Sequence, residues 1–312
     1  MGRLAQVLSE LENSPDPAEV LDQQPELPPG TWTIGLTGPP GAGKSTLLAS
    51  LVSAHKDTGR RVAVLAIDPT STRSGGALLG DRIRFGALGE GIFIRSVASR
   101  GHLGGLTTRL PVMIRALAAH GYEDIFVETV GVGQSEVAIR DAVDTTIVVV
   151  CPGQGDAVQA AKAGVLEIAD IYVVNKAELP GASDTLRNLR NSVLYEKAGA
   201  QPGDWQPSVV NTTAVTDDIS QLREQMQKHR EWLLADHRLE FRRAAGVRGE
   251  LRGVVGAYLL EQLDAALCDG SFLALSRQIG RSEAGRSQAV ATLLEAVRHG
   301  VTVTFPHGRT GS

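Results

Sequence analysis

Eight consecutive residues near the N-terminus have the types and spacing of a phosphate-binding loop. They fit the pattern G-x-x-x-x-G-K-[ST], in which glycines let the backbone curl so that several N–H groups point at one anion. An apolar run at 31–36 precedes them, and apolar residues follow at helical spacing over 47–52. We therefore expect a strand, the loop, and a helix whose N-terminal end faces the same phosphate. The loop consists of Gly38, Pro39, Pro40, Gly41, Ala42, Gly43, Lys44 and Ser45.

The last residues of this loop carry the groups that act on a nucleoside triphosphate. Lys44 is expected to reach the β- and γ-phosphates, and the hydroxyl of Ser45 is expected to bind Mg²⁺. Thr46, which begins a predicted helix over 46–54, is assigned to the same nucleotide site. The residue types thus predict a phosphate site with a bound Mg²⁺ ion.

Acidic residues follow two predicted strands and supply further candidates for metal binding and catalysis. Asp68 ends the run 61–67, and Glu128 ends the run 124–128, so both belong at the edge of a parallel sheet where ligands bind. Each is a candidate to bind Mg²⁺ or to align the attacking water, and Asp81 is a further candidate metal ligand. The alternatives are that Asp68 turns the chain with Pro69, that Glu128 is a solvated strand end, and that Asp81 complements a helix dipole. Three residues after Glu128 the backbone N–H of Gly131 can approach the γ-phosphate, since glycine has no side chain to block it.

A third cluster indicates which base is bound. Asn175-Lys176-Ala177-Glu178 approximates N-K-x-D, in which the carboxylate accepts hydrogen bonds from guanine and the lysine stem lies along the base. Here Glu178 stands where the pattern has aspartate. Backbone N–H groups of Thr213 and Ala214 lie in a later loop that is a candidate to contact the base. The alternative for the cluster is an ordinary turn after a strand.

The elements that must position these residues alternate between strand and helix from about 31 to 213. Most predicted strands are continuous apolar runs, which is typical of strands covered on both faces of a parallel sheet. The pattern predicts a doubly wound α/β domain. The predicted strands are Thr33–Leu36, Arg61–Ile67, Gly91–Ser96, Asp124–Glu128, Thr145–Val150, Ile171–Val174 and Ser208–Asn211, and the predicted helices are Thr46–Ala54, Leu106–His120, Ala157–Ala169 and Leu186–Glu196.

The remainder of the chain predicts two flanking regions. Residues 1–30 combine a short helix candidate with a Pro-rich strap, residues 31–215 form the nucleotide-binding domain, and residues 216–312 form a helical C-terminal extension. Within that extension the stretch 239–267 holds four glycines and is expected to break into two helices. The other helices expected there are Ile219–Leu234, Ser271–Gln278 and Ser282–Arg298.

Composition restricts the class of protein. The 312 residues carry a formal charge of −4 and only 4% aromatic residues, which gives no support for nucleic acid as the main ligand. The chain has two cysteines, Cys151 and Cys268, so we expect neither a disulfide framework nor a Cys-rich zinc site. It shows no signal-peptide core and no apolar run of membrane-spanning length, so we expect a cytoplasmic protein without a membrane partner.

Taken together, these motifs resemble the ArgK/MeaB family, the G-protein chaperones of adenosylcobalamin-dependent methylmalonyl-CoA mutase. The resemblance covers roughly residues 31–240 and is much more specific than a phosphate-binding loop alone. The segments that carry it, besides that loop, are Val64–Ser71, Gly75–Asp81, Ser99–Gly101, Gly104–Leu106, Val127–Glu136 and Val174–Ala177.

The resemblance implies a GTPase domain of the SIMIBI type that hydrolyses GTP to GDP with Mg²⁺. It also implies a client, an adenosylcobalamin-dependent acyl-CoA mutase whose cofactor loading the protein gates, and a homodimer built through helical extensions. Asp68, Asp81 and Glu128 match the family's acidic positions around Mg²⁺ and the attacking water. A segment that responds to nucleotide and client is matched by Gln154, Asp156, Gln159 and Lys162, and Arg73 and Arg100 are candidates to be moved into the site by the client.

Three alternatives remain from the sequence. A P-loop kinase or ATPase differs by binding ATP as well as GTP. A nickel-handling metallochaperone GTPase generally displays Cys or His clusters, which this chain does not show. A nucleotide-gated scaffold differs by having negligible hydrolysis.

Overall fold

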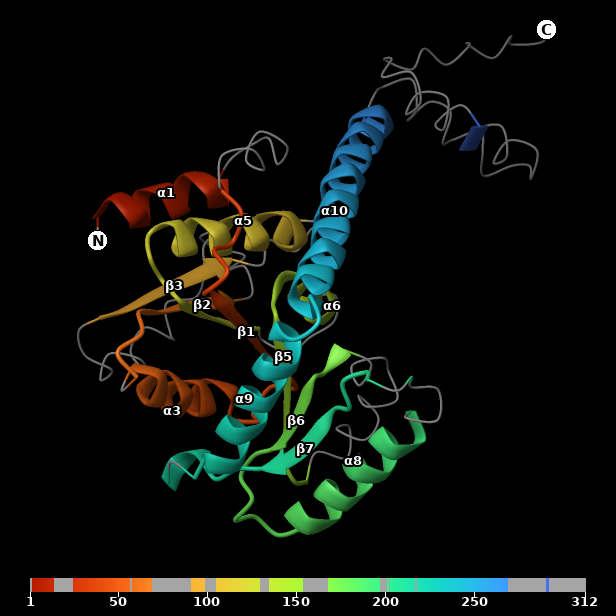
Figure 1. Ribbon diagram of the computed structural model, residues 1–312. Coiled ribbons are helices and arrows are strands. Elements are labelled where there is room, and N and C mark those ends of the chain that lie inside the picture. The colour runs from red at the N-terminus through yellow and green to blue at the C-terminus, as the bar shows by residue number, and fades with distance from the viewer. Residues whose placement is uncertain are drawn as a thin grey trace, which may run out of the picture. The chain divides into compact units, whose positions relative to one another are not determined.

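A single parallel sheet forms the centre of the protein. The computed structural model describes residues 2–13, 25–56, 58–68, 91–98, 105–129, 135–153, 168–196, 201, 203–216, 218–268 and 290–291. Seven strands lie in the order β3-β2-β4-β1-β5-β6-β7, and every neighbouring pair is parallel (Figure 1). All the strands predicted from apolar runs are present. They are β1 (Trp32–Thr37), β2 (Val62–Asp68), β3 (Ile92–Ala98), β4 (Asp124–Glu128), β5 (Thr145–Val150), β6 (Ile171–Val174) and β7 (Ser208–Asn211).

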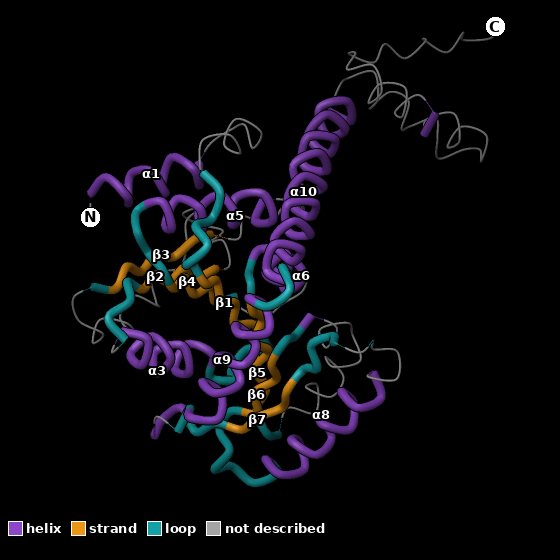
Figure 2. The backbone as a smooth tube through the Cα atoms, in the orientation of Figure 1, coloured by secondary structure: helices purple, strands orange, loops and turns teal. Residues whose placement is uncertain are grey.

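Helices cover both faces of the sheet, as expected for a doubly wound fold (Figure 2). One face packs against α1, α5, α6 and α8, and the opposite face packs against α3 and α9. The helices are α1 (Gly2–Asn13), α3 (Lys44–Lys56), α5 (Gly105–Ala119), α6 (Ser135–Ala142), α8 (Ala182–Glu196), α9 (Ser220–Leu234) and α10 (Arg238–Cys268), with a 3-10 turn, η4 (Ala214–Thr216), before α9.

The continuous apolar runs are explained by this double cover. Successive side chains of a strand point to opposite faces, so a strand between two helical layers needs apolar residues at every position. In β2, Val62 and Val64 lie in the core that contains α3, whereas Ala63 and Leu65 lie in the core that contains α5. Burial on both faces therefore fixes β2 in the interior of the sheet.

The C-terminal region differs from the prediction in one respect. Instead of breaking at its glycines, the stretch 239–267 forms one helix, α10, of 31 residues. Contacts divide the chain into two compact units, residues 1–251 and 252–312, so the first turns of α10 belong to the unit that contains the sheet. The predicted helices at 157–169, 271–278 and 282–298 lie outside the described residues, apart from 168–169 and 290–291.

Three buried aspartates line the N-terminal edge of the sheet, each paired with an arginine fork. Asp124, Asp144 and Asp170 stand at or just before the starts of β4, β5 and β6. Arg60 binds Asp124 through Nε and Nη2 at 2.8 and 2.7 Å. Two adjacent residues of α10 bind the other two aspartates: Arg243 contacts both oxygens of Asp144 at 2.9 Å, and Arg242 contacts those of Asp170 at 2.9 and 2.8 Å. Such bidentate charge-assisted pairs are strong, and two of them fasten α10 to the sheet.

Burial alone would disfavour these charges, and the arginines compensate for it. For Asp124, burial raises the pKa, but hydrogen bonds from His55 and Arg60 outweigh that effect and hold the pKa below its usual value of 3.8. Next to this row His229 of α9 is fully buried against Trp205 and Trp232, and burial lowers its pKa to about 4. His229 is therefore neutral near pH 7, and its Nδ1 is 3.0 Å from the hydroxyl of Thr145.

Within the described part of the chain, each helix is too short or too polar to cross a lipid bilayer.

Candidate nucleotide site

The phosphate-binding loop lies between the C-terminal end of β1 and the N-terminal end of α3. Gly38, Gly41 and Gly43 have φ values of 136°, 80° and 86°, which side-chain-bearing residues rarely adopt. A Cβ atom on Gly38 would overlap the carbonyl oxygen of Val149 in β5, and one on Gly43 would lie 2.5 Å from Nδ2 of Asn175. Glycine is therefore required twice over at these two positions, by conformation and by close contact.

Lys44 is buried at the start of α3, and its side chain lies over the loop. The Nζ atom donates hydrogen bonds to the carbonyl oxygens of Gly38 and Pro39 at 2.7 and 3.1 Å. A lysine in this position presents one positive charge at the mouth of a backbone curl and beside a helix N-terminus. These features together form an anion site.

Ser45, in the first turn of α3, meets Glu128 at the end of β4. The Ser45 hydroxyl is 2.6 Å from Oε1 of Glu128, which is buried at the end of β4. The parallel pairing of β1 with β4 brings them together, because Leu36 pairs with Glu128 two residues before the loop begins. One residue after Glu128, the hydroxyl of Thr129 donates to the hydroxyl of Thr37 at 2.8 Å. This hydrogen bond links the end of β4 to the end of β1.

The pair formed by Ser45 and Glu128 fits a magnesium ion chemically. Mg²⁺ prefers hard oxygen ligands, commonly uses only one or two from the protein, and takes the rest from water and phosphate. Among the residues that the structure describes, no group of three or more His, Cys, Asp and Glu side chains is placed to hold a metal. The hydroxyl and carboxylate here therefore suit a metal that the substrate's phosphates help to bind.

Asn175 joins the loop after β6 to the phosphate-binding loop. Its Nδ2 donates to the carbonyl oxygen of Ala42 at 2.9 Å, and its Oδ1 accepts from the hydroxyl of Thr212 at 3.0 Å and from the backbone N–H of Ala214 at 3.4 Å. The side chain is almost fully buried. One amide thus holds together the segments after β1, β6 and β7, which are far apart in the sequence.

The neighbouring residues of this loop differ in burial and in their contacts. Lys176 has a φ of 58°, and its Nζ donates to the carbonyl oxygen of Gly41 at 2.8 Å. Its stem therefore runs along the phosphate-binding loop. Glu178 is exposed, and Thr213 is half-buried. Ala214 is buried, and its backbone N–H donates a hydrogen bond to Oδ1 of Asn175.

The structure places part of the predicted site. It brings together the loop Gly38–Ser45, Glu128, and the pair Asn175 and Lys176 at the C-terminal edge of the sheet. For Asp68 only the backbone is described: it ends β2, two residues beyond Ala66, which pairs with Glu128. The remaining candidates lie outside the described residues and stay predictions: Arg73, Asp81, Arg100, Gly131, Gln154, Asp156, Gln159 and Lys162.

Three contacts in the site were not predicted. Thr37 and Thr129 join two strand ends, Thr212 supports Asn175, and the Cys151 sulfur lies 3.9 Å from the carbonyl oxygen of Gly41. Each of these small polar residues directly follows or ends a strand of the sheet. That position was the available signal, but it does not say which partner each residue meets.

Comparisons with known proteins agree with this geometry. The family model described as "Methylmalonyl Co-A mutase-associated GTPase MeaB" matches residues 4–267. A Pyrococcus abyssi protein that carries the name of a GTPase is 39% identical over 297 residues, covering 94% of this chain and 92% of that protein. The mouse methylmalonic aciduria type A homolog is 36% identical over 219 residues, covering 69% and 53%. A crystal structure of an LAO/AO transport system kinase superposes with a TM-score of 0.64 at 25% identity, covering 96% of this chain and 97% of that one.

Proposed function

Because the chain belongs to the MeaB family of methylmalonyl-CoA mutase-associated GTPases, we propose that it is a Mg²⁺-dependent GTPase that acts as chaperone to an adenosylcobalamin-dependent acyl-CoA mutase. The observation that carries the nucleotide part is the contact of Asn175 with the phosphate-binding loop. It joins an N-K-x-E segment to the phosphate-binding loop, which supports the proposal that one nucleotide contacts both segments.

The residues of the proposed site have different roles in hydrolysis. The loop amides and Lys44 stabilise negative charge on the β- and γ-phosphates. Ser45 and Glu128, together with the predicted ligands Asp68 and Asp81, would hold Mg²⁺, which when bound neutralises charge on the phosphate oxygens. Glu128 or Asp68 aligns the attacking water, and Thr129, through Thr37, fixes the strand end that carries Glu128. With no arginine among these groups, intrinsic turnover is expected to be slow.

Guanine selectivity depends on Glu178 in this proposal. Replacing Glu178 with alanine should weaken GTP binding about ten- to a hundredfold, because hydrogen bonds from the base to a carboxylate are lost. ATP binding should stay as in the wild type, because adenine has no matching donor pair. Competition of GTP and ATP for a fluorescent guanine nucleotide measures both, and Glu178→Asp, which restores the usual motif, is the matched control. Equal wild-type affinity for GTP and ATP would favour the kinase or ATPase alternative.

The mutase partner is the second part of the proposal, and the family name supports it. We expect steady-state GTP turnover to rise at least about tenfold when a purified adenosylcobalamin-dependent acyl-CoA mutase is added, because a client can supply the missing transition-state charge. Phosphate release with and without the mutase is the measurement, and serum albumin at the same concentration is the control. Turnover that is the same with the mutase and with albumin would argue against the client.

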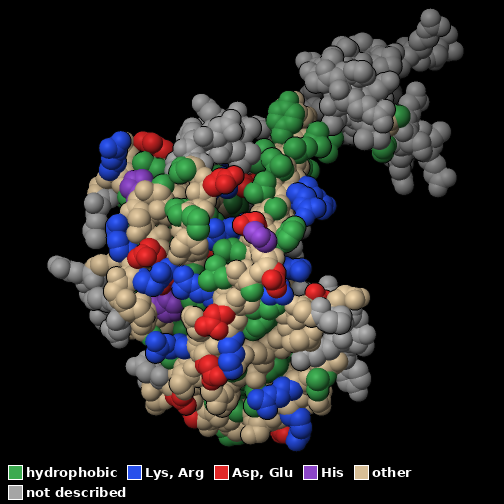
Figure 3. Space-filling model, in the orientation of Figure 1, with side chains coloured by type: hydrophobic (Ala, Val, Ile, Leu, Met, Phe, Trp, Pro, Cys, Tyr) green, Lys and Arg blue, Asp and Glu red, His purple; other side chains and the backbone are tan. Residues whose placement is uncertain are grey.

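We also propose that the protein is a homodimer joined through residues 216–312. In the unit 252–312, Val255, Tyr258, Leu259 and Leu260 of α10 are exposed. Figure 3 shows hydrophobic side chains gathered along the described turns of this helix. Clusters of exposed large apolar side chains are typical of protein interfaces. Two copies of one helix would cover these side chains on each other.

A further inference from the structure

Helix α6 is packed between glycines on two sides. On the sheet side, a Cβ on Gly35 of β1 would lie 2.7 Å from Cδ1 of Ile139. On the other side, a Cβ on Gly246 of α10 would overlap the carbonyl oxygen of Asp141, and one on Gly249 would lie 2.8 Å from Oδ2 of Asp141. The contact at Gly246 is with the backbone and leaves no room for a side chain, whereas the contacts at Gly35 and Gly249 are with side-chain atoms that can shift. A shift of α6 would therefore change its contacts with both β1 and α10.

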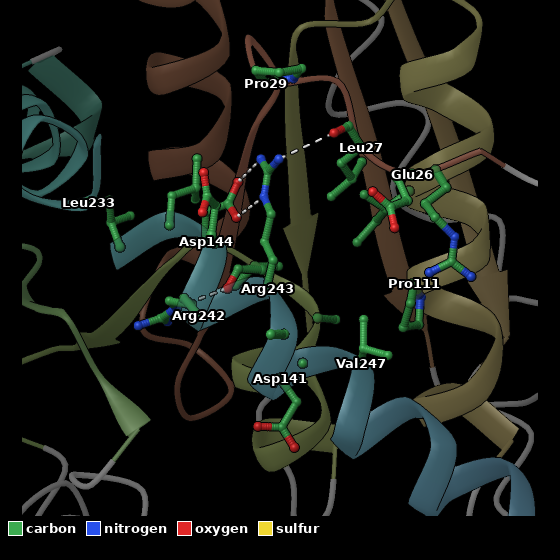
Figure 4. Close-up of a pocket in the computed structure, with 18 of the residues that line it drawn as sticks. Glu26, Leu27, Pro29, Pro111, Asp141, Asp144, Leu233, Arg242, Arg243 and Val247 are labelled. Atoms are coloured by element: carbon green, nitrogen blue, oxygen red, sulfur yellow. Dashed lines mark hydrogen bonds and ion pairs between the residues drawn. The ribbon is translucent and has the colours of Figure 1, made fainter. Parts of the chain in front are cut away.

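Residues of α10 also hold the segment that follows α6. Arg242 donates from Nε to the carbonyl oxygen of Val143 at 3.3 Å, and Arg243 forms its fork with Asp144 (Figure 4). We call Arg242, Arg243, Gly246 and Gly249 the α10 seat. All four contact residues 141–144.

The surroundings leave room for the end of α6 to move. A pocket of about 1080 Å³ is bordered by residues 141–144, by the start of α10, by α5 and by the segment 26–29 (Figure 4). On its α5 side, Arg115 and Glu250 form a bidentate pair at 2.8 and 2.9 Å that holds α10 to α5. Asp141 and Ala142 are not buried and border this pocket, whereas Val143 and Asp144, which also line it, are buried.

Helix α6 is also connected to both strands that lead into the nucleotide site. By covalent connection, residues 130–134 join its start to Thr129 and Glu128 at the end of β4. By packing, Ile139 contacts Gly35, three residues before Gly38 of the phosphate-binding loop. The position of α6 is therefore linked to the carboxylate and to the loop that together surround the γ-phosphate in the proposed function.

We propose that the α10 seat holds α6 in the position that favours a bound nucleoside triphosphate. Helix α6 in turn positions Glu128 and the phosphate-binding loop. This role rests on the proposed function, because it concerns how that site distinguishes GTP from GDP. Coupling between two sites is reciprocal, so bound GTP in turn changes the α10 seat. The contacts of α10 with residues 141–144 therefore depend on whether GTP or GDP is bound.

Three glycine-to-alanine variants of one helix provide the test. Gly246→Ala should lower affinity for a non-hydrolysable GTP analogue relative to GDP by about two- to thirtyfold, the usual range for coupling residues. Gly249→Ala should have a smaller effect in the same direction, because the atom it meets is the end of a movable carboxylate. Gly256→Ala is the control: it gains the same helix propensity, but its Cβ would meet no described atom within 4 Å. In catalysis, KM for GTP should rise more than kcat falls. Equal affinity ratios in all three variants would overturn the proposal.

A measurement on the unmodified protein covers the case in which Gly246→Ala does not fold. Hydrogen exchange of peptides covering 238–251 should differ between the GTP-analogue and GDP complexes, whereas peptides covering α8 should not. Unchanged exchange at 238–251, with both nucleotides bound, would refute the α10 seat and leave the GTPase proposal intact. A wild-type protein that binds no guanine nucleotide would instead refute the proposed function itself.

Discussion

Lys44→Ala is expected to lower the rate of GTP hydrolysis by about a hundred- to a thousandfold, the loss typical when one preorganised charge-stabilising group is removed from an active site. The buried Nζ lies over the carbonyl oxygens of Gly38 and Pro39, at the mouth of the loop that is proposed to hold the β- and γ-phosphates. Alanine keeps the helix start but removes that charge. Single-turnover release of phosphate from saturating GTP is the measurement.

A matched control separates loss of this charge from loss of any lysine. Lys228→Ala removes an exposed lysine of α9 whose ion pair with Glu224 spans one helical turn, so turnover should be unchanged. A Lys44→Ala protein that keeps turnover within about threefold of the wild type would contradict the assigned role. If the variant loses turnover but a mutase still responds to bound GTP, the scaffold alternative gains support, because binding alone would then suffice for the client.

The local part of the site could be predicted because its signals are local. The loop Gly38–Ser45 is specified by residues adjacent in the chain, and each strand by its own apolar run. The contact of Asn175 with Ala42 joins residues 133 positions apart, and nothing in either segment names the other. The forks of Arg242 and Arg243 with buried aspartates are of the same kind. Sequence patterns thus predicted which segments follow the strands at the edge of the sheet that carries the site, but not the pairing of residues distant in the sequence.

Helices α6 and α10 show how packing overrides local preference. Glycine is a poor helix former, so the glycines of 239–267 predicted a break that the structure does not contain. Gly246 and Gly249 lie where α10 contacts Asp141, and at Gly246 the contact with the Asp141 carbonyl oxygen leaves no room for a side chain. Helix α6, with eight residues, is too short to show helical periodicity, and it was not predicted. Both outcomes follow from contacts made only in the folded chain.

Removing the guanidinium of Arg243 should destabilise the fold by about 3–5 kcal/mol, because it leaves a buried carboxylate without its charge partner. Asp144 is only 2% exposed, and its other described donor is the backbone N–H of Thr33 at 3.0 Å. Arg243 also donates to the carbonyl oxygen of Thr31 at 2.8 Å, so the same change frees a second acceptor. Urea unfolding of Arg243→Ala against the wild type measures the free energy of unfolding.

The exposed ion pair on α8 is the control for this variant. Arg187 and Asp184 are 2.6 Å apart, but their side chains are 70% and 67% exposed, so water replaces the pair and Arg187→Ala should cost less than about 1 kcal/mol. Adding Asp144→Asn to Arg243→Ala should recover part of the loss, because a neutral amide is less costly to bury than an unpaired carboxylate. Such recovery would show that the penalty arises from the isolated charge of Asp144 rather than from lost arginine packing. If Arg243→Ala costs no more than Arg187→Ala, the fork does not fasten α10, and the α10 seat would lack one of its two anchors on the segment after α6.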